Sequence, residues 1–241
     1  MKGVILAGGT GSRLFPLTRY TNKHLLPVGK YPMICYPVER LKQAGITQIM
    51  IVTSRNYIGQ VIELLGSGAE WGLKFTYQVQ DQAGGIAAAL LLAEEFAAGE
   101  RLAVLLGDNL FEADLRPYLE KFLQQPSGMK ILLKEVDDPH GYGIAELQNG
   151  RVVGIEEKPS FPKSRLCVTG IYFYDSRVFD IIKQLKPSGR GELEITDVNR
   201  AYLEQGDLSY DILEGWWIDA GTFRSLELAN KYARDLTLNL W

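Results

Sequence analysis

A glycine-rich segment followed by basic side chains lies close to the N-terminus, and this arrangement is suited to binding an anion. The apolar run Val4-Ile5-Leu6 leads into Ala7-Gly8-Gly9-Thr10-Gly11, and Arg13 follows. Glycine lets the backbone approach a phosphate closely and turns N–H groups toward it. A phosphate-binding loop at the end of a strand is one interpretation, and a tight turn whose glycines need positive φ is the other.

Two familiar phosphate motifs do not match this loop. A Walker A loop ends in Gly-Lys-Ser/Thr, whereas Gly11 is followed by Ser12-Arg13. A dinucleotide fingerprint needs a third glycine where the chain has Leu14, which argues against an NAD-dependent dehydrogenase. Lys23 alone would be an ordinary surface lysine, but together with Arg13 it supplies the two cations that suit a triphosphate. His24 is expected to pack or form hydrogen bonds rather than to act as a base.

Two carboxylates come directly after predicted strands. Asp108 follows residues 102–106, and Asp219 follows Trp216-Trp217-Ile218. Open α/β sheets bind ligands outside the carboxyl ends of their strands, so both positions are candidates for a site. As alternatives, Asp108 caps a turn after Gly107 and Asp219 caps the last helix.

Short β-branched runs alternate with amphipathic stretches in the first part of the chain. Strands are predicted over residues 4–6, 49–53, 75–79, 102–106 and 130–135, and helices over 32–44, 57–65, 86–96 and 115–123. This alternation predicts an α/β fold with a doubly wound, mostly parallel, Rossmann-like sheet.

The pattern changes after about residue 140. Asn149-Gly150 between two apolar runs predicts an inserted β-hairpin. Further strands are predicted over 167–174, 209–213 and 216–219, and helices over 178–185, 195–204 and 223–236. We expect a single domain over residues 1–241, with a nucleotide-binding half over about 1–135 and a half over about 136–241 whose hairpin region holds a second substrate.

Composition narrows the function classes. The 241 residues are 46% hydrophobic and 23% charged, with a net charge of −3 and scattered Lys and Arg, which argues against a nucleic-acid partner. Cys35 and Cys167 lie far apart in apolar stretches and are expected to be buried thiols in a reducing compartment. The N-terminal apolar run is too short for a signal peptide, and the longest one, residues 86–93, is too short for a membrane span. We therefore expect a cytoplasmic protein with no membrane partner.

Short motifs spread along the chain resemble the signature of the sugar nucleotidyltransferases. They lie at residues 3–9, 11–14, 16–18, 23–28, 32–37, 107–109, 141–143, 156–159, 168–174, 191–197 and 217–222. Each motif is weak alone, but together they cover almost the whole chain in order. The resemblance is closest to members that transfer a thymidylyl group to glucose 1-phosphate, in the short form that lacks extra C-terminal helices. Product feedback through a second nucleotide site is accordingly expected to be absent or weakened.

The resemblance implies a displacement at the α-phosphorus of dTTP, or UTP, by a phosphate oxygen of a hexose 1-phosphate. With glucose 1-phosphate the products are dTDP-glucose and pyrophosphate, and Mg²⁺ is the implied cofactor. Because the attacking oxygen is already anionic, no general base is required. Positioning and charge neutralisation are expected to dominate catalysis.

The resemblance also assigns roles to individual residues. The implied catalytic residues are Arg13, Lys23 and Asp108, and the implied Mg²⁺ ligands are Asp108 and Asp219. The implied nucleotide-binding residues are Leu6, Ala7, Gly8, Gly9, Gly11, Arg13, Gln80, Gly85 and Asp108. The implied sugar-phosphate-binding residues are Asn109, Gly143, Glu157, Lys158, Val168 and Gly170.

The chain departs from the family pattern near the expected base site. Gln80 is followed by Asp81 instead of proline, and Ala88 replaces a glutamine. These departures keep a uridylyltransferase, or another pair of nucleotide and sugar 1-phosphate, as an alternative. A non-catalytic nucleotide-sugar-binding subunit is the alternative from another class, although such a subunit is expected to lose a metal carboxylate or the loop arginine. A homo-oligomer remains open.

Overall fold

A computed structural model describes residues 1–239, and a nine-stranded mixed sheet forms its centre. The main path runs β10-β9-β11-β6-β1-β4-β5, while β8 pairs with β11 and carries β12. The strands are β1 (Lys2–Ala7), β4 (Gln48–Ser54), β5 (Lys74–Gln80), β6 (Leu102–Leu106), β8 (Met129–Glu135), β9 (Gly143–Gln148), β10 (Arg151–Glu157), β11 (Leu166–Tyr174) and β12 (Leu208–Ile212).

The direction of the strands confirms the predicted mostly parallel sheet. The pairs β6-β1, β1-β4, β4-β5 and β8-β12 are parallel, whereas the pairs of β11 with β6, β8 and β9, and of β9 with β10, are antiparallel. Among the described strands of this sheet, all but β11 and β10 therefore run in one direction.

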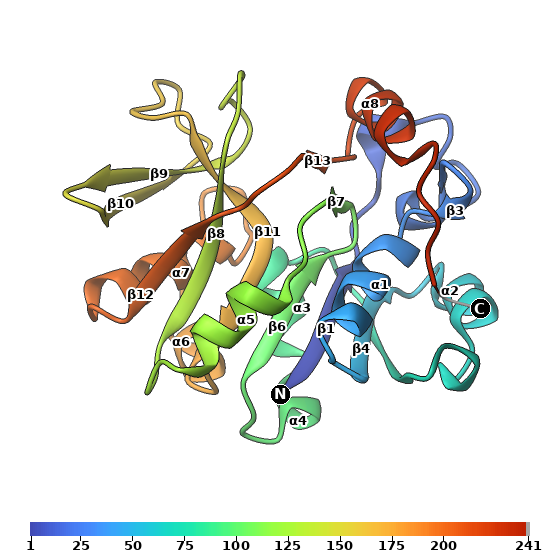
Figure 1. Cartoon of the computed structure of the whole chain (residues 1–241), viewed down its shortest axis with the longest axis horizontal. Coiled ribbons are helices and arrows are strands. Elements are labelled where there is room, and N and C mark those ends of the chain that lie inside the picture. The colour runs from blue at the N-terminus through green and yellow to red at the C-terminus, as the bar shows by residue number, and fades with distance from the viewer. Residues whose placement is uncertain (240–241) are drawn as a thin grey trace.

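Helices cover both faces of the sheet, which confirms the doubly wound arrangement (Figure 1). They are α1 (Cys35–Gln43), α2 (Ile58–Leu65), α3 (Ile86–Leu91), α4 (Glu94–Ala97), α5 (Arg116–Leu123), α6 (Val178–Gln184), α7 (Ile195–Glu204) and α8 (Phe223–Ala233). On β1, Ile5 packs into the core that α1, α2, α5 and α8 complete, and Val4 packs into the core of α3, α4, α6 and α7. A strand buried on both faces reads as a continuous apolar run, as this one does.

The predicted hairpin is present as β9 and β10 and extends one end of the sheet (Figure 1). Its turn residues Asn149 and Gly150 have φ of 51° and 73°. These positive angles are those of a type I′ turn, whose twist matches that of the flanking strands.

Short strands outside the main sheet account for the largest differences from the sequence prediction. The helix expected over 32–44 begins at Cys35, because β3 (Tyr31–Pro32) pairs with β2 (Pro27–Val28). A three-residue strand, β7 (Asn109–Phe111), was not predicted and pairs with β13 (Trp217–Asp219). Runs of two or three residues are too short to show a hydrophobic period.

Two helices differ in extent. The helix expected over 86–96 is divided into α3 and α4, and a hydrogen bond from the Ala93 N–H to the Leu90 carbonyl tightens the chain between them. The last helix ends at Ala233 instead of residue 236.

Cys35 and Cys167 are buried free thiols, as predicted. Within residues 1–239, no helix has both the length and the apolar character needed to cross a membrane.

Candidate active site

A cavity of about 380 Å³ collects most of the residues predicted for a site. It opens where β1 and β6 end and where β9, β10 and β11 approach them. The predicted residues that line it are Leu6, Gly8, Gly9, Arg13, Lys23, Gln80, Gly85, Asp108, Asn109, Gly143, Glu157, Lys158, Val168, Gly170 and Asp219.

Two predicted nucleotide-binding residues, Ala7 and Gly11, do not line the cavity. Ala7 is fully buried, and its carbonyl accepts hydrogen bonds from the side chains of Asn22 and Thr53. Gly11 has φ of +62°, and its carbonyl accepts a hydrogen bond from the Thr18 hydroxyl. A side chain there would lie 2.8 Å from Thr18. Gly11 therefore serves the turn itself, while Gly8 and Gly9 face the open space.

Asp108 is held at the end of β6 by an ion pair with Lys23. The Lys23 ammonium donates to Asp108 Oδ2, and the side chains are only 15% and 8% exposed. Burial would raise the pKa of Asp108, but the adjacent Lys23 outweighs burial and holds that pKa well below its usual range. Asp108 is thus an anion at neutral pH, and its carboxylate oxygens accept from the side chains of Lys23 and Asn109.

Asp219 reaches the same point from the other half of the chain. In the β7–β13 ladder it pairs with Asn109, and the next N–H, of Ala220, donates to the Asp108 carbonyl at 2.9 Å. Burial first, and then the negative charge of Asp108, raise the pKa of Asp219 to about 6. The short ladder therefore brings together two carboxylates that are distant in sequence.

A divalent cation fits these carboxylates. Within residues 1–239, no group of three or more His, Cys, Asp or Glu side chains could hold a metal by itself. Mg²⁺ normally binds through one or two carboxylates and completes its shell with water and substrate phosphates. Two mutually repelling carboxylates beside a glycine-lined cavity match that donor set, because a bound cation would relieve the repulsion that raises the pKa of Asp219.

The electrostatics of Asp219 give a prediction that needs no substrate. The pKa of Asp219 in the folded protein is about 6, above the ordinary value near 4, so the folded state favours the protonated carboxyl. The free energy of unfolding that Asp219 contributes is therefore present at low pH and is lost as the pH rises through about 6. Without Mg²⁺ at about pH 7, we expect Asp219→Asn to raise the melting temperature by about 2–4 °C. The gain should shrink at about pH 4. Scanning calorimetry at both pH values measures it, and a less stable variant at pH 7 would contradict the assignment.

His24 is a packing residue, as expected. It is 1% exposed, and its Nδ1 lies 2.5 Å from Asn22 Oδ1, an oxygen that also accepts from the His24 N–H. Burial, aided by the nearby Lys23 charge, lowers the pKa of His24 to about 3. The ring is therefore neutral, and its Nδ1–H donates to Asn22.

Glu157 and Lys158 lie on the opposite wall of the cavity, at the end of β10. Glu157 Oε2 accepts a hydrogen bond from the Thr196 hydroxyl, and Lys158 Nζ lies 3.3 Å from Glu157 Oε1. Lys158 has φ of +43°, which is uncommon for a non-glycine residue, and its N–H donates to the Tyr142 carbonyl. Strained backbone of this kind tends to occur at functional positions.

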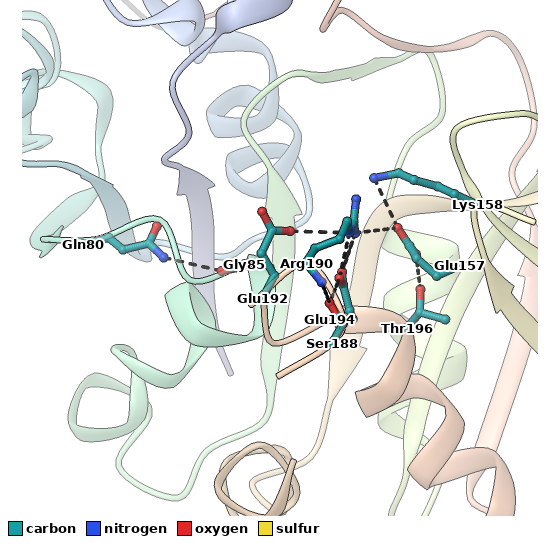
Figure 2. Close-up of polar contacts among 9 residues, drawn as sticks. All are labelled: Gln80, Gly85, Glu157, Lys158, Ser188, Arg190, Glu192, Glu194 and Thr196. Carbon is teal, nitrogen blue, oxygen red and sulfur yellow. Dashed lines mark hydrogen bonds and ion pairs between the residues drawn. The ribbon is translucent and has the colours of Figure 1, made fainter. Parts of the chain in front are cut away.

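The sequence prediction missed a cation beside this pair. Arg190 lines the same cavity, with Nη2 3.5 Å from Glu157 Oε1 (Figure 2). It lies in the glycine-flanked loop before α7, and an arginine between glycines was the available signal. Other missed lining residues are Tyr142, Thr196 and Trp217. They lie within the motifs at residues 141–143, 191–197 and 217–222, but nothing in those motifs singles these side chains out, and it is the fold that brings them to the cavity.

Asn109 is engaged mainly with its neighbours. Its Oδ1 accepts from the Gly170 N–H at 2.9 Å and from Trp217 Nε1 at 2.8 Å, while Nδ2 donates to Asp108 Oδ1 at 3.2 Å. A Cβ at Gly170 would lie 2.7 Å from the Asn109 oxygen, so this close approach requires glycine. The predicted sugar contact of Asn109 thus competes with a structural role.

Gln80 and Gly85 lie together at the remaining end of the cavity. Gln80 Nε2 donates to the Gly85 carbonyl at 3.4 Å (Figure 2). Gly85 has φ of +93°, and a Cβ there would lie 2.5 Å from the Leu193 carbonyl oxygen. Ala88, which replaces the family glutamine, is not among the residues lining the cavity. The carboxamide of Gln80 therefore lines this end of the cavity without a glutamine at position 88 beside it.

A doubly wound sheet with a glycine loop, buried carboxylates and cations around one cavity defines a nucleotide-binding α/β enzyme that acts on phosphorylated substrates. The family model described as Nucleotidyl transferase matches residues 2–235. The chain belongs to this nucleotidyl transferase family.

Similar proteins carry consistent names. A glucose-1-phosphate thymidylyltransferase from Neisseria meningitidis is 44% identical over 97% of this chain and 83% of its own length. One from Mycobacterium tuberculosis is 42% identical over 98% and 83%. A crystal structure from Bacillus anthracis, assigned as a glucose-1-phosphate thymidylyltransferase and bound to sucrose, is 59% identical with a TM-score of 0.96, covering 98% of this chain and 96% of its own. A UDP-glucose pyrophosphorylase bound to UDP-glucose is 26% identical with a TM-score of 0.85, over 98% and 99%.

Proposed function

We propose that the protein transfers a thymidylyl group from dTTP to glucose 1-phosphate, with dTDP-glucose and pyrophosphate as products. The observation that carries the proposal is one cavity that combines two close carboxylates, Asp108 and Asp219, with cations at both ends. The names of relatives at 42–44% identity support the choice of substrates. An intact set of carboxylates and cations argues against a non-catalytic binding subunit.

The nucleotide occupies the side of the cavity formed by about residues 1–135. Backbone N–H groups of Gly8 and Gly9 approach the triphosphate, and Arg13 and Lys23 offset its charge. Gln80 meets the base edge, since an amide donates and accepts at once. The half over about 136–241 contributes the sugar-phosphate side, together with Asp219.

The reaction is a direct displacement. A phosphate oxygen of glucose 1-phosphate forms a bond to the α-phosphorus of dTTP, and the bond from that phosphorus to the β-bridging oxygen breaks. The electron pair leaves on pyrophosphate, so no proton has to move. A neutral, buried His24 is consistent with a site that needs no base. Lys158 and Arg190 offset the charge of the incoming phosphate.

Asp108 and Asp219 would be the residues that hold Mg²⁺ in this cavity. When bound, the ion supplies positive charge that stabilises the crowded phosphoryl group. Lys23, which pairs with Asp108 in the free protein, would offset the negative charge of the triphosphate from its place in the same cavity. Preorganised charge in a site that excludes water is worth far more than the same charge in solution.

Glu157 and Gly143 define the hexose side. The Glu157 carboxylate accepts hydrogen bonds from sugar hydroxyls. A Cβ at Gly143 would lie 3.2 Å from Thr196 Oγ1 and 3.5 Å from Glu157 Oε2, so a larger residue would intrude on this space. The carboxylate is already oriented by Thr196, which lowers the ordering needed when sugar binds.

A grid of substrates tests the proposal. Pyrophosphate release is measured for dTTP, UTP, ATP and GTP against glucose, galactose and mannose 1-phosphates, with and without Mg²⁺. We expect the highest kcat/KM for dTTP with glucose 1-phosphate, and release only with a divalent ion. A preference for UTP would select the uridylyltransferase alternative, and no release with any pair would reject the transferase.

Removal of the Lys158 ammonium should act on one substrate. We expect Lys158→Ala to raise KM for glucose 1-phosphate about tenfold or more, because it deletes a charge-assisted contact to the phosphate. KM for dTTP should change less than about twofold. Lys163→Ala is the matched control, since Lys163 lies on the same loop but outside this cavity. A selective loss of dTTP use would reverse our assignment of the two ends of the cavity.

A further inference from the structure

The Arg190 guanidinium donates hydrogen bonds to the carboxylate of Glu194, at the start of α7. Its Nε donates to Glu194 Oε1 at 3.1 Å, and Nη2 lies 2.8 Å from both Glu194 oxygens. The carboxylates of Glu157 and Glu192 are more distant from Nη2, at 3.5 and 3.7 Å. Hydrogen bonds to Glu194 are also the main reason why the pKa of Arg190 lies above its ordinary value. Glu194 is therefore the group that fixes the guanidinium plane (Figure 2).

The Glu194 carboxylate is itself immobilised. The residue is 9% exposed, and its Oε1 also accepts from the Ser188 hydroxyl at 2.8 Å. The Ser188 N–H in turn donates to the Glu192 carbonyl at 2.8 Å, which closes the loop. The Arg190 side chain, in contrast, is 46% exposed. A rigid, buried anion thus orders a long side chain that would otherwise sample many rotamers.

Glu194 lies at the N-terminus of α7, but its side chain does not cap the helix. It occupies the N-cap of α7, where Ser, Thr, Asp or Asn would normally accept a backbone hydrogen bond. Its side chain makes no capping hydrogen bond and is turned to Arg190 instead. Thr196, two residues later, donates its hydroxyl to Glu157 Oε2. The first turn of α7 therefore orients both polar groups on the sugar side.

We propose that Glu194 is a positioning residue for the sugar 1-phosphate, acting through Arg190. Its two oxygens engage Nε and Nη2, on one edge of the guanidinium. The hydrogen bonds of Arg190 within residues 1–239 use Nε and Nη2, which leaves Nη1 available to an incoming phosphate in the cavity that Arg190 lines. The inference rests on the proposed function, because it requires that a sugar phosphate binds here.

The test compares three glutamate variants by steady-state kinetics. Glu194→Gln keeps the shape but removes the charge, and we expect KM for glucose 1-phosphate to rise about tenfold while KM for dTTP changes less than about twofold. Glu192→Gln is the matched control on the same loop, and we expect a rise below about twofold because its contact is longer. Glu194→Asp keeps the negative charge on a side chain one methylene shorter, and its KM for glucose 1-phosphate should lie between those of the unaltered protein and Glu194→Gln. This variant also tests the proposal if Glu194→Gln does not fold.

A double-mutant comparison separates positioning from a structural role. In an Arg190→Ala background, Glu194→Gln should have no further effect on KM for glucose 1-phosphate, since the residue it acts through is gone. Additive losses, equal rises for both substrates, or equal effects of the Glu192 and Glu194 variants would each overturn the proposal. The unaltered protein separates failure of the proposed function from failure of the positioning role. If it releases no pyrophosphate from dTTP and glucose 1-phosphate, the proposed function is rejected. If it releases pyrophosphate normally and Glu194→Gln leaves KM for glucose 1-phosphate unchanged, only the positioning role is rejected.

Discussion

Asp108→Ala is expected to lower turnover by about a thousandfold, the largest effect of any single substitution considered. The carboxylate is buried, ionised at neutral pH, and adjacent to Asp219 at the point where both substrates would meet. Its removal would delete one of the two proposed ligands for Mg²⁺ and the ion-pair partner of Lys23. Pyrophosphate release under saturating dTTP, glucose 1-phosphate and Mg²⁺ measures the loss, and near-normal turnover would refute the metal role.

A second lysine–aspartate pair controls for the loss of stability. Lys130 and Asp211 form an ion pair at 2.5 Å with 4% and 19% exposed side chains, on β8 and β12 and away from the cavity. Asp211→Ala and Asp108→Ala should therefore both lower the melting temperature, because each substitution removes the ion-pair partner of a poorly solvated lysine. Only Asp108→Ala should abolish turnover. An equal loss in both variants would show that destabilisation explains the effect.

Arg13→Ala is expected to lower kcat about a hundredfold. Arg13 is exposed in the free protein, and its guanidinium lies beside the segment that carries Asp219. A Cβ on Gly221 would lie 2.8 Å from Arg13 Nη2. From this position it can offset charge that develops on the transferred phosphoryl group. The effect should fall mainly on kcat, because the interaction strengthens in the transition state.

Two further variants sharpen the Arg13 experiment. Arg13→Lys keeps the charge but loses the planar fork, so we expect an intermediate kcat. Arg19→Ala removes another exposed arginine of the same N-terminal segment, whose guanidinium lies 5.3 Å from the Tyr20 ring and outside the cavity. It should leave kcat unchanged within about twofold. A rise in KM for dTTP with normal kcat in Arg13→Ala would assign Arg13 to ground-state binding alone.

Local sequence was sufficient for much of the fold and for part of the site. Continuous apolar runs predicted the strands that are buried on both faces, and Asn149-Gly150 predicted the hairpin turn. Asp108 was found because it comes directly after such a strand, and the carboxyl ends of parallel strands meet at one edge. Asp219 was indicated in the same way, although it would also suit a cap of the last helix, and the family resemblance added Lys158, whose own surroundings in the sequence would also suit a surface turn.

The remainder of the site depends on contacts between distant segments. Trp217 reaches the cavity only through the ladder between β7 and β13, and β7 is too short to leave a periodic pattern. Arg190 and Glu194 belong to a loop that packs beside Gly85, far away in the chain. No periodicity or spacing encodes such pairings, because they arise from packing of the finished sheet.

The β7–β13 ladder has a consequence for how the protein is made. Asp108 emerges from the ribosome long before Asp219, and folding proceeds from the N-terminus as synthesis advances. Until β13 pairs with β7, Lys23 can neutralise Asp108, so the buried carboxylate of the earlier segment is charge-balanced without the later one. The pair of carboxylates is therefore completed only when the returning strand β13 pairs with β7 and places Asp219 beside Asp108.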